Sequence, residues 1–213
     1  MKSLHIVLFL LLLLFPFTYK TIAQLQQDNL VRDHNGKPLE VTGKYFIVAT
    51  KVVMGLSRKL TLSIYLEGNC RNAVTLAQAF QPGIPCSFHH AKATGDSYIH
   101  ILKSLNVKFE TDTPSCANST VWRISDPDDK THERVVRIGG VLGSPGCSTS
   151  RNWFKIMTGD SPNTYKIVSH PKDVCASPGA AIFHNLRLNF HPFKRPLVRS
   201  DDLNGFEVYF VEA

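Results

Sequence analysis

The sequence lacks the patterns that accompany the commonest enzyme and metal sites. No pair of its five cysteines has the Cys-x-x-Cys spacing of a structural zinc site or a thioredoxin-like redox motif. No Gly-x-Ser-x-Gly segment is present, so the exposed nucleophile of an α/β-hydrolase has no counterpart. The adjacent His89 and His90 have no carboxylate or cysteine at ligand spacing. We therefore predict that the protein is not an enzyme and has no metal site and no cofactor.

Blocks of like charge are missing as well. The formal net charge is +7, and the 24 basic residues are scattered rather than gathered in a run of five or six. Zinc-finger spacings, RNA-recognition motifs and basic stripes with interleaved aromatic residues are also absent. This pattern is typical of a mildly basic, solvated surface, so we expect no nucleic-acid partner.

Only one long hydrophobic run occurs, and it lies at the N-terminus. Residues 6–17 are almost entirely apolar, follow the charged Lys2 and precede small residues at 21–23. A membrane-spanning helix needs about 20 apolar residues, and this run is shorter. The layout is typical of a secretory signal that is cleaved off. We predict a signal peptide over 1–23 and a secreted protein, extracellular in the apoplast or vacuolar, with no membrane association after cleavage.

The remaining segment, 24–213, is predicted to form one domain and to be monomeric. Its length suits a single hydrophobic core, and without Lys2 and Lys20 its net charge is +5. In a secreted chain the cysteines are expected to form disulfides. Because their number is odd, at least one thiol stays free or pairs between molecules, and the sequence alone does not fix the connectivity.

Segments with a helical period of apolar residues are also lacking. Instead, short stretches carry β-branched or aromatic residues at alternate positions, with Gly, Pro, Asn, Asp and Ser between them. The strands expected from this pattern are 44–48, 60–64, 74–76, 98–101, 105–109, 121–124, 135–138, 153–156, 165–168 and 206–211. Many short strands separated by turns predict an all-β sandwich or barrel.

Three of the expected strands are similar to one another. Tyr45-Phe-Ile-Val, Tyr98-Ile-His-Ile and Trp153-Phe-Lys-Ile begin at nearly equal intervals along the chain. An interval of this size is typical of repeat architectures, and three such units fill the segment after residue 23. Three similar strand units closing one barrel form the β-trefoil plan, which this spacing favours.

Longer motifs occur in a specific order along the chain. Val31-Arg-Asp33-His-Asn-Gly36-Lys-Pro38-Leu39 is followed by Tyr45-Phe-Ile47, then by Pro82-Gly83-Ile84-Pro85 and Leu105-Asn-Val-Lys-Phe109. Trp153-Phe-Lys-Ile156, Tyr165-Lys-Ile-Val168 and Phe206-Glu-Val-Tyr-Phe210 come later. The set resembles the plant Kunitz-type (soybean-trypsin-inhibitor-like) protease inhibitors, which include miraculin-like proteins. The resemblance implies a β-trefoil of about twelve strands, serine-protease inhibition and a role in plant defence.

The resemblance also implies disulfides. It pairs Cys70 with Cys116. The first cysteine of the family's second disulfide normally lies just before a proline, where this chain has His170 and Pro171. Cys147 is a candidate substitute as the partner of Cys175, and Cys86 is then a buried free thiol.

The family's inhibitory loop follows the Gly-x-Pro segment and precedes the strand expected at 98–101. The resemblance places the loop residues here at His89, His90, Ala91, Lys92, Ala93 and Thr94. Lys92 is the only strongly basic residue in that loop, so we predict Lys92 as P1 and Ala93 as P1′. A lysine suits the aspartate at the base of a trypsin-like pocket. The expected partner is a secreted or digestive protease, of the serine type.

Two departures from the family pattern leave alternatives open. Val41 stands where many family members have an asparagine that braces the loop, and the loop is longer and contains Gly95. One alternative is a non-inhibitory, miraculin-like binding, storage or defence protein. Another is an inhibitor of a cysteine or aspartic protease that acts through a different loop. Asn118 begins the only N-glycosylation sequon, so we also predict a glycoprotein.

Overall fold

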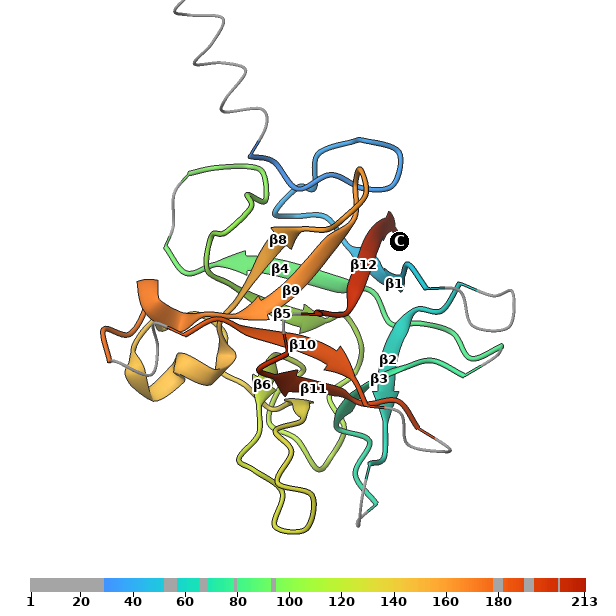
Figure 1. Ribbon diagram of the computed structural model, residues 1–213, viewed down its shortest axis with the longest axis vertical. Helices are drawn as coiled ribbons and strands as arrows, with labels where there is room; N and C mark the ends of the chain where they lie inside the picture. The colour runs from blue at the N-terminus through green and yellow to red at the C-terminus, as the bar shows by residue number, and fades with distance from the viewer. Residues whose placement is uncertain are drawn as a thin grey trace, which may run out of the picture. The chain divides into compact units, whose positions relative to one another are not determined.

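The structure is a computed structural model that describes residues 29–51, 57–65, 69–78, 80–92, 95–177, 182–189, 194–202 and 204–213 (Figure 1). The chain divides into two compact units, residues 1–30 and 31–213, and the fold described below is that of the second. The signal peptide predicted over 1–23 lies outside the described residues. None of the described helices is long and apolar enough to cross a membrane.

Six strands pair in a closed ring. They are β1 (Tyr45–Ala49), β4 (Cys86–His90), β5 (Leu105–Phe109), β8 (Phe154–Thr158), β9 (Tyr165–Ser169) and β12 (Glu207–Glu212). Each strand pairs antiparallel with the next around the ring, and the pairing of β8 with β9 closes it. The ring is therefore a barrel, in which no strand of the six is left with an open edge.

The other six described strands form three hairpins. They are β2 (Leu60–Ser63) with β3 (Ala73–Leu76), β6 (Trp122–Ile124) with β7 (Val136–Ile138), and β10 (His184–Leu188) with β11 (Leu197–Ser200). The pairs Ala73–Arg137, Thr75–Pro196 and Val135–Val198 join the hairpins to one another. Each hairpin lies between two ring strands in the sequence, which gives three four-strand units and confirms the β-trefoil (Figure 1).

The sequence analysis predicted the wrong starting strands for the second and third repeat units. The three units begin at β1, β5 and β9, whose first residues Tyr45, Leu105 and Tyr165 are equally spaced along the chain. Tyr98 precedes β5 and Trp153 precedes β8, so neither is equivalent to Tyr45. Short alternating patterns recur in any β-rich chain, and the similarity between these four-residue segments is coincidental.

One expected strand is much reduced, and three strands, β4, β10 and β11, are absent from the ranges that the alternating pattern predicted. At 98–101 only isolated bridge residues occur, because the chain turns at Leu102, which has a φ of +62°. Strands β10 and β11 were not predicted, since basic and polar residues interrupt their apolar pattern. Two short 3₁₀ helices, η1 (Cys147–Asn152) and η2 (Pro171–Asp173), lie in segments to which the sequence assigned no structure.

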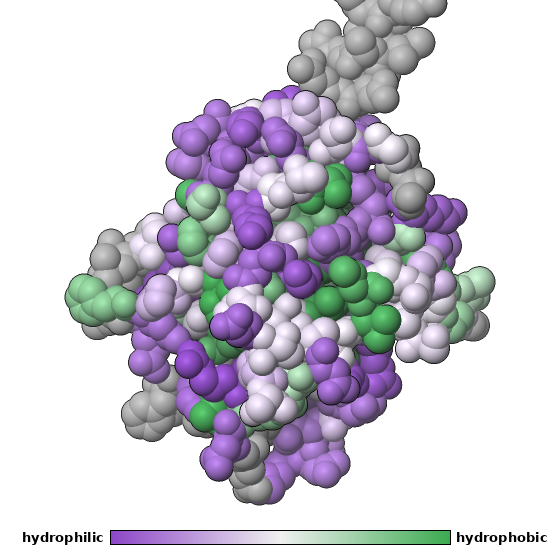
Figure 2. Space-filling view, turned by 180° about the vertical axis from the view of Figure 1, so that it is seen from behind, coloured by the Kyte–Doolittle hydropathy of each residue, from purple (hydrophilic) through white to green (hydrophobic). Residues whose placement is uncertain are grey.

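Aromatic side chains fill the core of the barrel. Phe210 contacts Phe88 edge-on at a ring distance of 5.5 Å and Tyr165 at 5.4 Å. Trp122 lies 5.3 Å from Phe109 and is fully buried. Such pairs add to the free energy gained from burying each ring. On the face shown in Figure 2, hydrophobic groups form separated patches among hydrophilic ones.

The structure contains two disulfides, between the pairs that the sequence analysis named. Cys70 is bonded to Cys116, and Cys147 to Cys175. The first closes a loop of 46 residues and the second one of 28. Loops of these lengths correspond to about 3–4 kcal/mol of stabilisation each when the unfolded chain is constrained. Cys86 is free and fully buried, and burial raises the pKa of its thiol.

We expect Phe88→Ala to destabilise the fold by about 3–5 kcal/mol, because it opens a cavity beside Phe210. Phe80 provides the matched control, since its side chain is 99% exposed. Phe80→Ala should change the free energy of unfolding by no more than about 0.5 kcal/mol. Urea denaturation of both variants measures the difference, and equal effects would contradict the assignment of Phe88 to the core.

Candidate functional site

The predicted loop residues fall into two groups in the structure. His89 and His90 belong to β4 rather than to the loop, because they pair with Asn106 and Leu105 of β5. The pairing continues one step further, where the Ala91 amide donates to the Ser104 carbonyl at 3.0 Å. The connecting segment therefore begins at residue 91 and not at His89, as the sequence suggested. Of the predicted P1–P1′ pair, Ala93 lies outside the described residues, as does Thr94.

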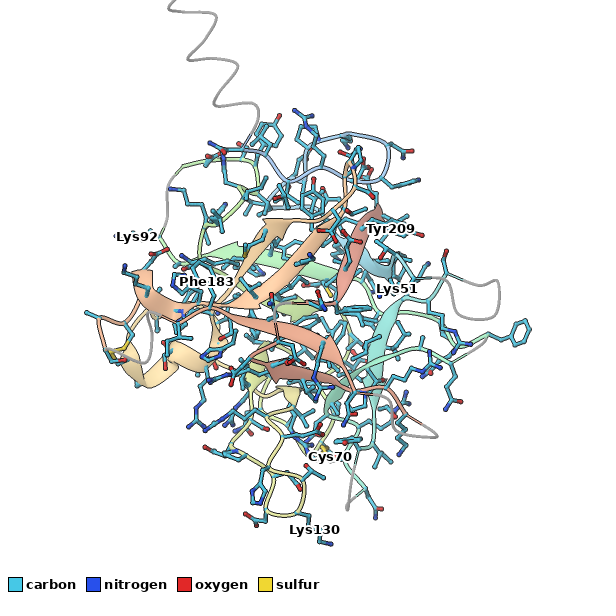
Figure 3. All side chains as sticks on the ribbon, viewed as in Figure 1. Lys51, Cys70, Lys92, Lys130, Phe183 and Tyr209 are labelled. Atoms are coloured by element: carbon cyan, nitrogen blue, oxygen red, sulfur yellow. A yellow bond between two sulfur atoms is a disulfide. The ribbon has the colours of Figure 1, made fainter. Side chains whose placement is uncertain are left out.

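Lys92 is exposed where the chain leaves β4. Within the described part of the chain its ammonium group makes no hydrogen bond and no ion pair. In Figure 3 it lies at one edge of the molecule, on the opposite side of the view from Lys51. A positively charged side chain is thus available to a partner at the end of a rigid strand.

Backbone hydrogen bonds hold the chain that follows the loop. The Val41 amide donates to the Ser97 carbonyl at 2.9 Å, and Tyr98 forms a bridge with Glu40. One residue further, the Ile99 amide donates to Leu39 at 2.8 Å, and Ile99 is fully buried. Val41, noted above for its lack of a bracing side chain, therefore holds this part of the loop through its main chain.

Side chains inside the loop add a second set of contacts. One oxygen of Asp96 accepts a hydrogen bond from the Tyr98 amide at 3.1 Å, and the other lies 2.5 Å from Nε2 of His100. The Tyr98 amide and then His100 lower the pKa of Asp96 below its usual value. His90 Nε2 lies 3.0 Å from the Tyr98 carbonyl, which can only accept, so the imidazole donates. These bonds tie the loop back to β4.

Gly95 lies in the left-handed region, with a φ of +66°. A Cβ atom added there would meet nothing within 4 Å, so space does not demand glycine at this position. The backbone angle favours glycine instead, because other residues adopt a positive φ at a cost of about 1 kcal/mol or more.

A serine and a histidine lie together at the base of β4, but not in the arrangement of a nucleophile and its base. Ser87 Oγ donates to Glu110 at 2.6 Å and lies 2.9 Å from His89 Nε2. Because the serine proton goes to the carboxylate, the imidazole donates to Ser87 and does not withdraw its proton. Burial, followed by the charge of Lys108, lowers the pKa of His89.

A hollow of about 240 Å³ lies beside the loop, and Asp173 is on its wall together with Lys92 and Lys103. Asp173 accepts a hydrogen bond from Lys155 at 2.6 Å, and the Lys155 side chain is only 6% exposed. It also accepts one from Ser104 at 3.3 Å, at the start of β5. The hydrogen bond from Lys155 and then its charge hold the pKa of Asp173 below its ordinary value. No group of three or more metal-ligating side chains occurs among the described residues.

The model of the legume Kunitz family, described as trypsin and protease inhibitor, matches residues 31–210. The chain belongs to the Kunitz-type inhibitor family. The family's members are described as inhibitors rather than enzymes. The matched segment contains β12 as far as Phe210, the other five ring strands, and the segment between β4 and β5.

Two curated relatives illustrate the range of the family. Kunitz trypsin inhibitor 3 of Arabidopsis thaliana is 27% identical over 202 residues, which cover 92% of this chain and 84% of that protein. Miraculin of Synsepalum dulcificum is 37% identical over 83 residues, but these cover only 38% of this chain and 37% of miraculin. A specific inhibitor and a differently named protein are thus both similar to this chain.

Solved Kunitz-type structures share its fold. A Kunitz-type cysteine protease inhibitor from potato superposes with a TM-score of 0.70 at 24% identity, covering 86% of this chain and 97% of that one. Soybean trypsin inhibitor superposes with a TM-score of 0.66 at 20% identity, covering 87% of this chain and all of that one. At these identities the likeness establishes the β-trefoil and not a target protease.

The sequence analysis named Lys92, but not the side chains of Asp96, His100 and Asp173 that line the same hollow in this Kunitz-type protein. Asp96 and His100 are close in the sequence, which is a weak signal that could have been noticed. Asp173 could not have been found, since 69 residues separate it from Ser104 and only the fold brings the two together.

We expect Asp173→Asn to cost about 1–2 kcal/mol at neutral pH, because the buried Lys155 ammonium loses its carboxylate. The cost stays below that of a fully buried pair because half of the Asp173 side chain is exposed. A carboxyl group whose pKa is lowered in the folded protein stabilises it above the ordinary value of 3.8, and that contribution disappears as the pH falls through the lowered pKa. Wild type and variant should therefore converge in stability in strong acid.

Urea denaturation at neutral and acidic pH measures this convergence. Asp160→Asn is the matched control, because Asp160 pairs with Lys166 while its own side chain is 79% exposed. It should cost less than about 0.5 kcal/mol. Equal costs for both variants would show that the burial of Lys155 is not the cause.

Proposed function

We propose that this chain is a secreted inhibitor of trypsin-like serine proteases, which presents the segment 91–97 to the enzyme with Lys92 as the P1 residue. The observation that carries the proposal is the exposed, unpaired Lys92 between two fixed stretches of chain. On one side the β4–β5 ladder extends to Ala91, and on the other Ser97 and Tyr98 are bonded to the segment before β1.

Rigidity of this kind favours tight binding. Ordering a flexible segment on association costs about 1–2 kcal/mol per residue, and a loop that is already fixed avoids most of that cost. The Asp96 contacts to Tyr98 and His100 lie within the loop itself, so they limit its motion as well. The described residues on either side of positions 93–94 would therefore change little when an enzyme docks.

The charge of Lys92 supports a trypsin-like target. The specificity pocket of trypsin has an aspartate at its base, and a lysine or arginine side chain pairs with it. The Arabidopsis relative that covers 92% of this chain is named a trypsin inhibitor, which agrees with this choice.

Secretion belongs to the same proposal. Two disulfides suit an oxidising compartment, and the apolar run at 6–17 supplies the export signal. Asn118 is exposed just after the disulfide-bonded Cys116, where a glycan attached to its sequon would extend into solvent.

The test is inhibition of trypsin by the disulfide-bonded protein. Lys92→Ala should weaken inhibition by about 100-fold or more, because a central charged anchor is lost. Lys92→Arg should retain it. Lys103→Ala is the matched control, since this exposed lysine lines the same hollow, and inhibition should be unchanged.

If Lys92→Ala still inhibits trypsin fully, Lys92 is not the P1 residue. A wild-type protein that is correctly folded and inhibits neither trypsin nor any other serine protease would favour the non-inhibitory alternative instead. Mapping the peptide bond cut by trypsin in the slowly dissociating complex would identify P1 directly.

A second loop gives one observation in favour of inhibition by a different route. Phe80 lies between β3 and β4 with a φ of +63° and a side chain that is 99% exposed. The turn is closed by the Gln81 amide, which donates to Gln78 at 3.1 Å. An exposed aromatic ring on a closed turn suits a hydrophobic pocket such as that of chymotrypsin.

Chymotrypsin and papain, assayed with Lys92→Ala and Phe80→Ala, test this second route. If Lys92→Ala inhibits as well as the wild type and Phe80→Ala inhibits about tenfold or more weakly, the inhibition is assigned to the Phe80 turn. Loss in Lys92→Ala alone would exclude the turn.

A further inference from the structure

A second hollow, of about 190 Å³, lies away from the inhibitory loop. Its walls come from β6, the chain before β7, η1, the end of β9 and the β10–β11 hairpin. Three arginines line it, Arg134, Arg151 and Arg199, and no aspartate or glutamate is among the described residues that do. We call it the arginine hollow.

The three guanidinium groups differ in their partners. Arg151 forms an ion pair with Asp126. Arg199 lies 2.6 Å from Nε2 of His184. Arg134 makes no side-chain hydrogen bond or ion pair with any residue that the structure describes. At least one full positive charge in the hollow is thus without a counterion.

His184 does not neutralise Arg199. A guanidinium can only donate, so Nε2 of His184 accepts from it, and Nδ1 donates to Asp201 at 2.6 Å. The imidazole is therefore neutral in this arrangement, and it separates the Asp201 carboxylate from Arg199. Burial, then the charge of Arg134, lowers the pKa of Arg199, while the charge of Asp201 acts in the opposite direction.

Hydroxyl groups add further donors. Ser169 is only 4% exposed, and Ser150 lies on η1, which the Cys147–Cys175 disulfide fixes. Neither hydroxyl has a hydrogen-bond partner within the described ranges of the chain. Both serines line the hollow, so their hydroxyls are available to donate to a ligand there.

The walls of the hollow are rigid. The disulfide ties η1 to the segment that follows η2, and η1 also contacts β6. On the other side the Arg199 amide donates to the Arg134 carbonyl at 2.8 Å. The donors consequently approach the hollow from several fixed directions, which suits a compact ligand with oxygens on all sides.

We propose that the arginine hollow binds a tetrahedral oxyanion, phosphate or sulfate, either free or as the terminal group of a monoester. The anion would accept hydrogen bonds from Arg134, Arg199, Ser150 and Ser169. A water molecule takes about 30 Å³ of liquid, so the volume accommodates an oxyanion with a few waters. Arginine is well suited to such ligands because its planar fork can donate two parallel hydrogen bonds.

Phosphorus-31 NMR of inorganic phosphate, titrated with the full disulfide-bonded chain at constant ionic strength, tests the proposal. We expect saturable broadening that sulfate displaces and chloride does not. Arg134→Gln should weaken binding about tenfold, the effect of one charge-assisted hydrogen bond. Ser169→Ala, a small change that leaves the fold intact, should weaken it several-fold.

Arg123→Gln is the matched control. Arg123 is on β6 and lines a different hollow, so its replacement changes the net charge equally without touching the arginine hollow. Equal weakening by Arg134→Gln and Arg123→Gln, or no saturable broadening at all, would overturn the proposal. Methyl phosphate distinguishes the ligand sources. Its binding supports a monoester, and binding of inorganic phosphate alone supports the free ion.

Discussion

Closure of the six-strand ring by the pairing of β8 with β9 is the constraint on which the other features depend. This pairing sets Ile156 against Ile167 in the core and places Lys155 beside Val168, with its ammonium on Asp173. Because the ring has no open edge, β4 and β5 cannot separate without breaking their neighbours. The segment proposed to bind the protease therefore extends from the barrel wall itself rather than from a free hairpin.

The sequence predicted local structure well where one short pattern determines it. Asp33 and Gly36 form a turn, as these residue types favour, with Gly36 at a φ of +84° and the Asp33 carboxylate accepting amide hydrogen bonds. The strands at β1, β5 and β9 also lie within one residue of their predicted ranges. The repeat phase was wrong because equivalence between units depends on which distant strands pair. Alternation in the sequence carries no information on that point.

The candidate site was predictable only in part, for the same reason. Lys92 is the only basic residue of its segment, so composition alone singles it out. Its position relative to the barrel depends on hydrogen bonds between residues far apart in the chain. The arginine hollow is a stronger case, since Arg134 and Arg199 are distant in the sequence and no motif contains both. The sequence named Cys147 as a candidate partner of Cys175, but it gave no indication that this disulfide would fix η1 beside the two arginines.

Val41 stands where many family members have an asparagine that braces the loop. The structure shows which contacts hold the loop at this position. A main-chain hydrogen bond to a loop does not depend on which side chain is present. Here the Val41 amide bonds to Ser97, and Asp96 bonds to Tyr98 and His100 on the other side of that residue. A loop restrained from both directions loses little order when one side-chain contact is missing. The main chain of residue 41 therefore holds Ser97 whichever side chain stands there, and the proposed inhibitory role rests on Lys92.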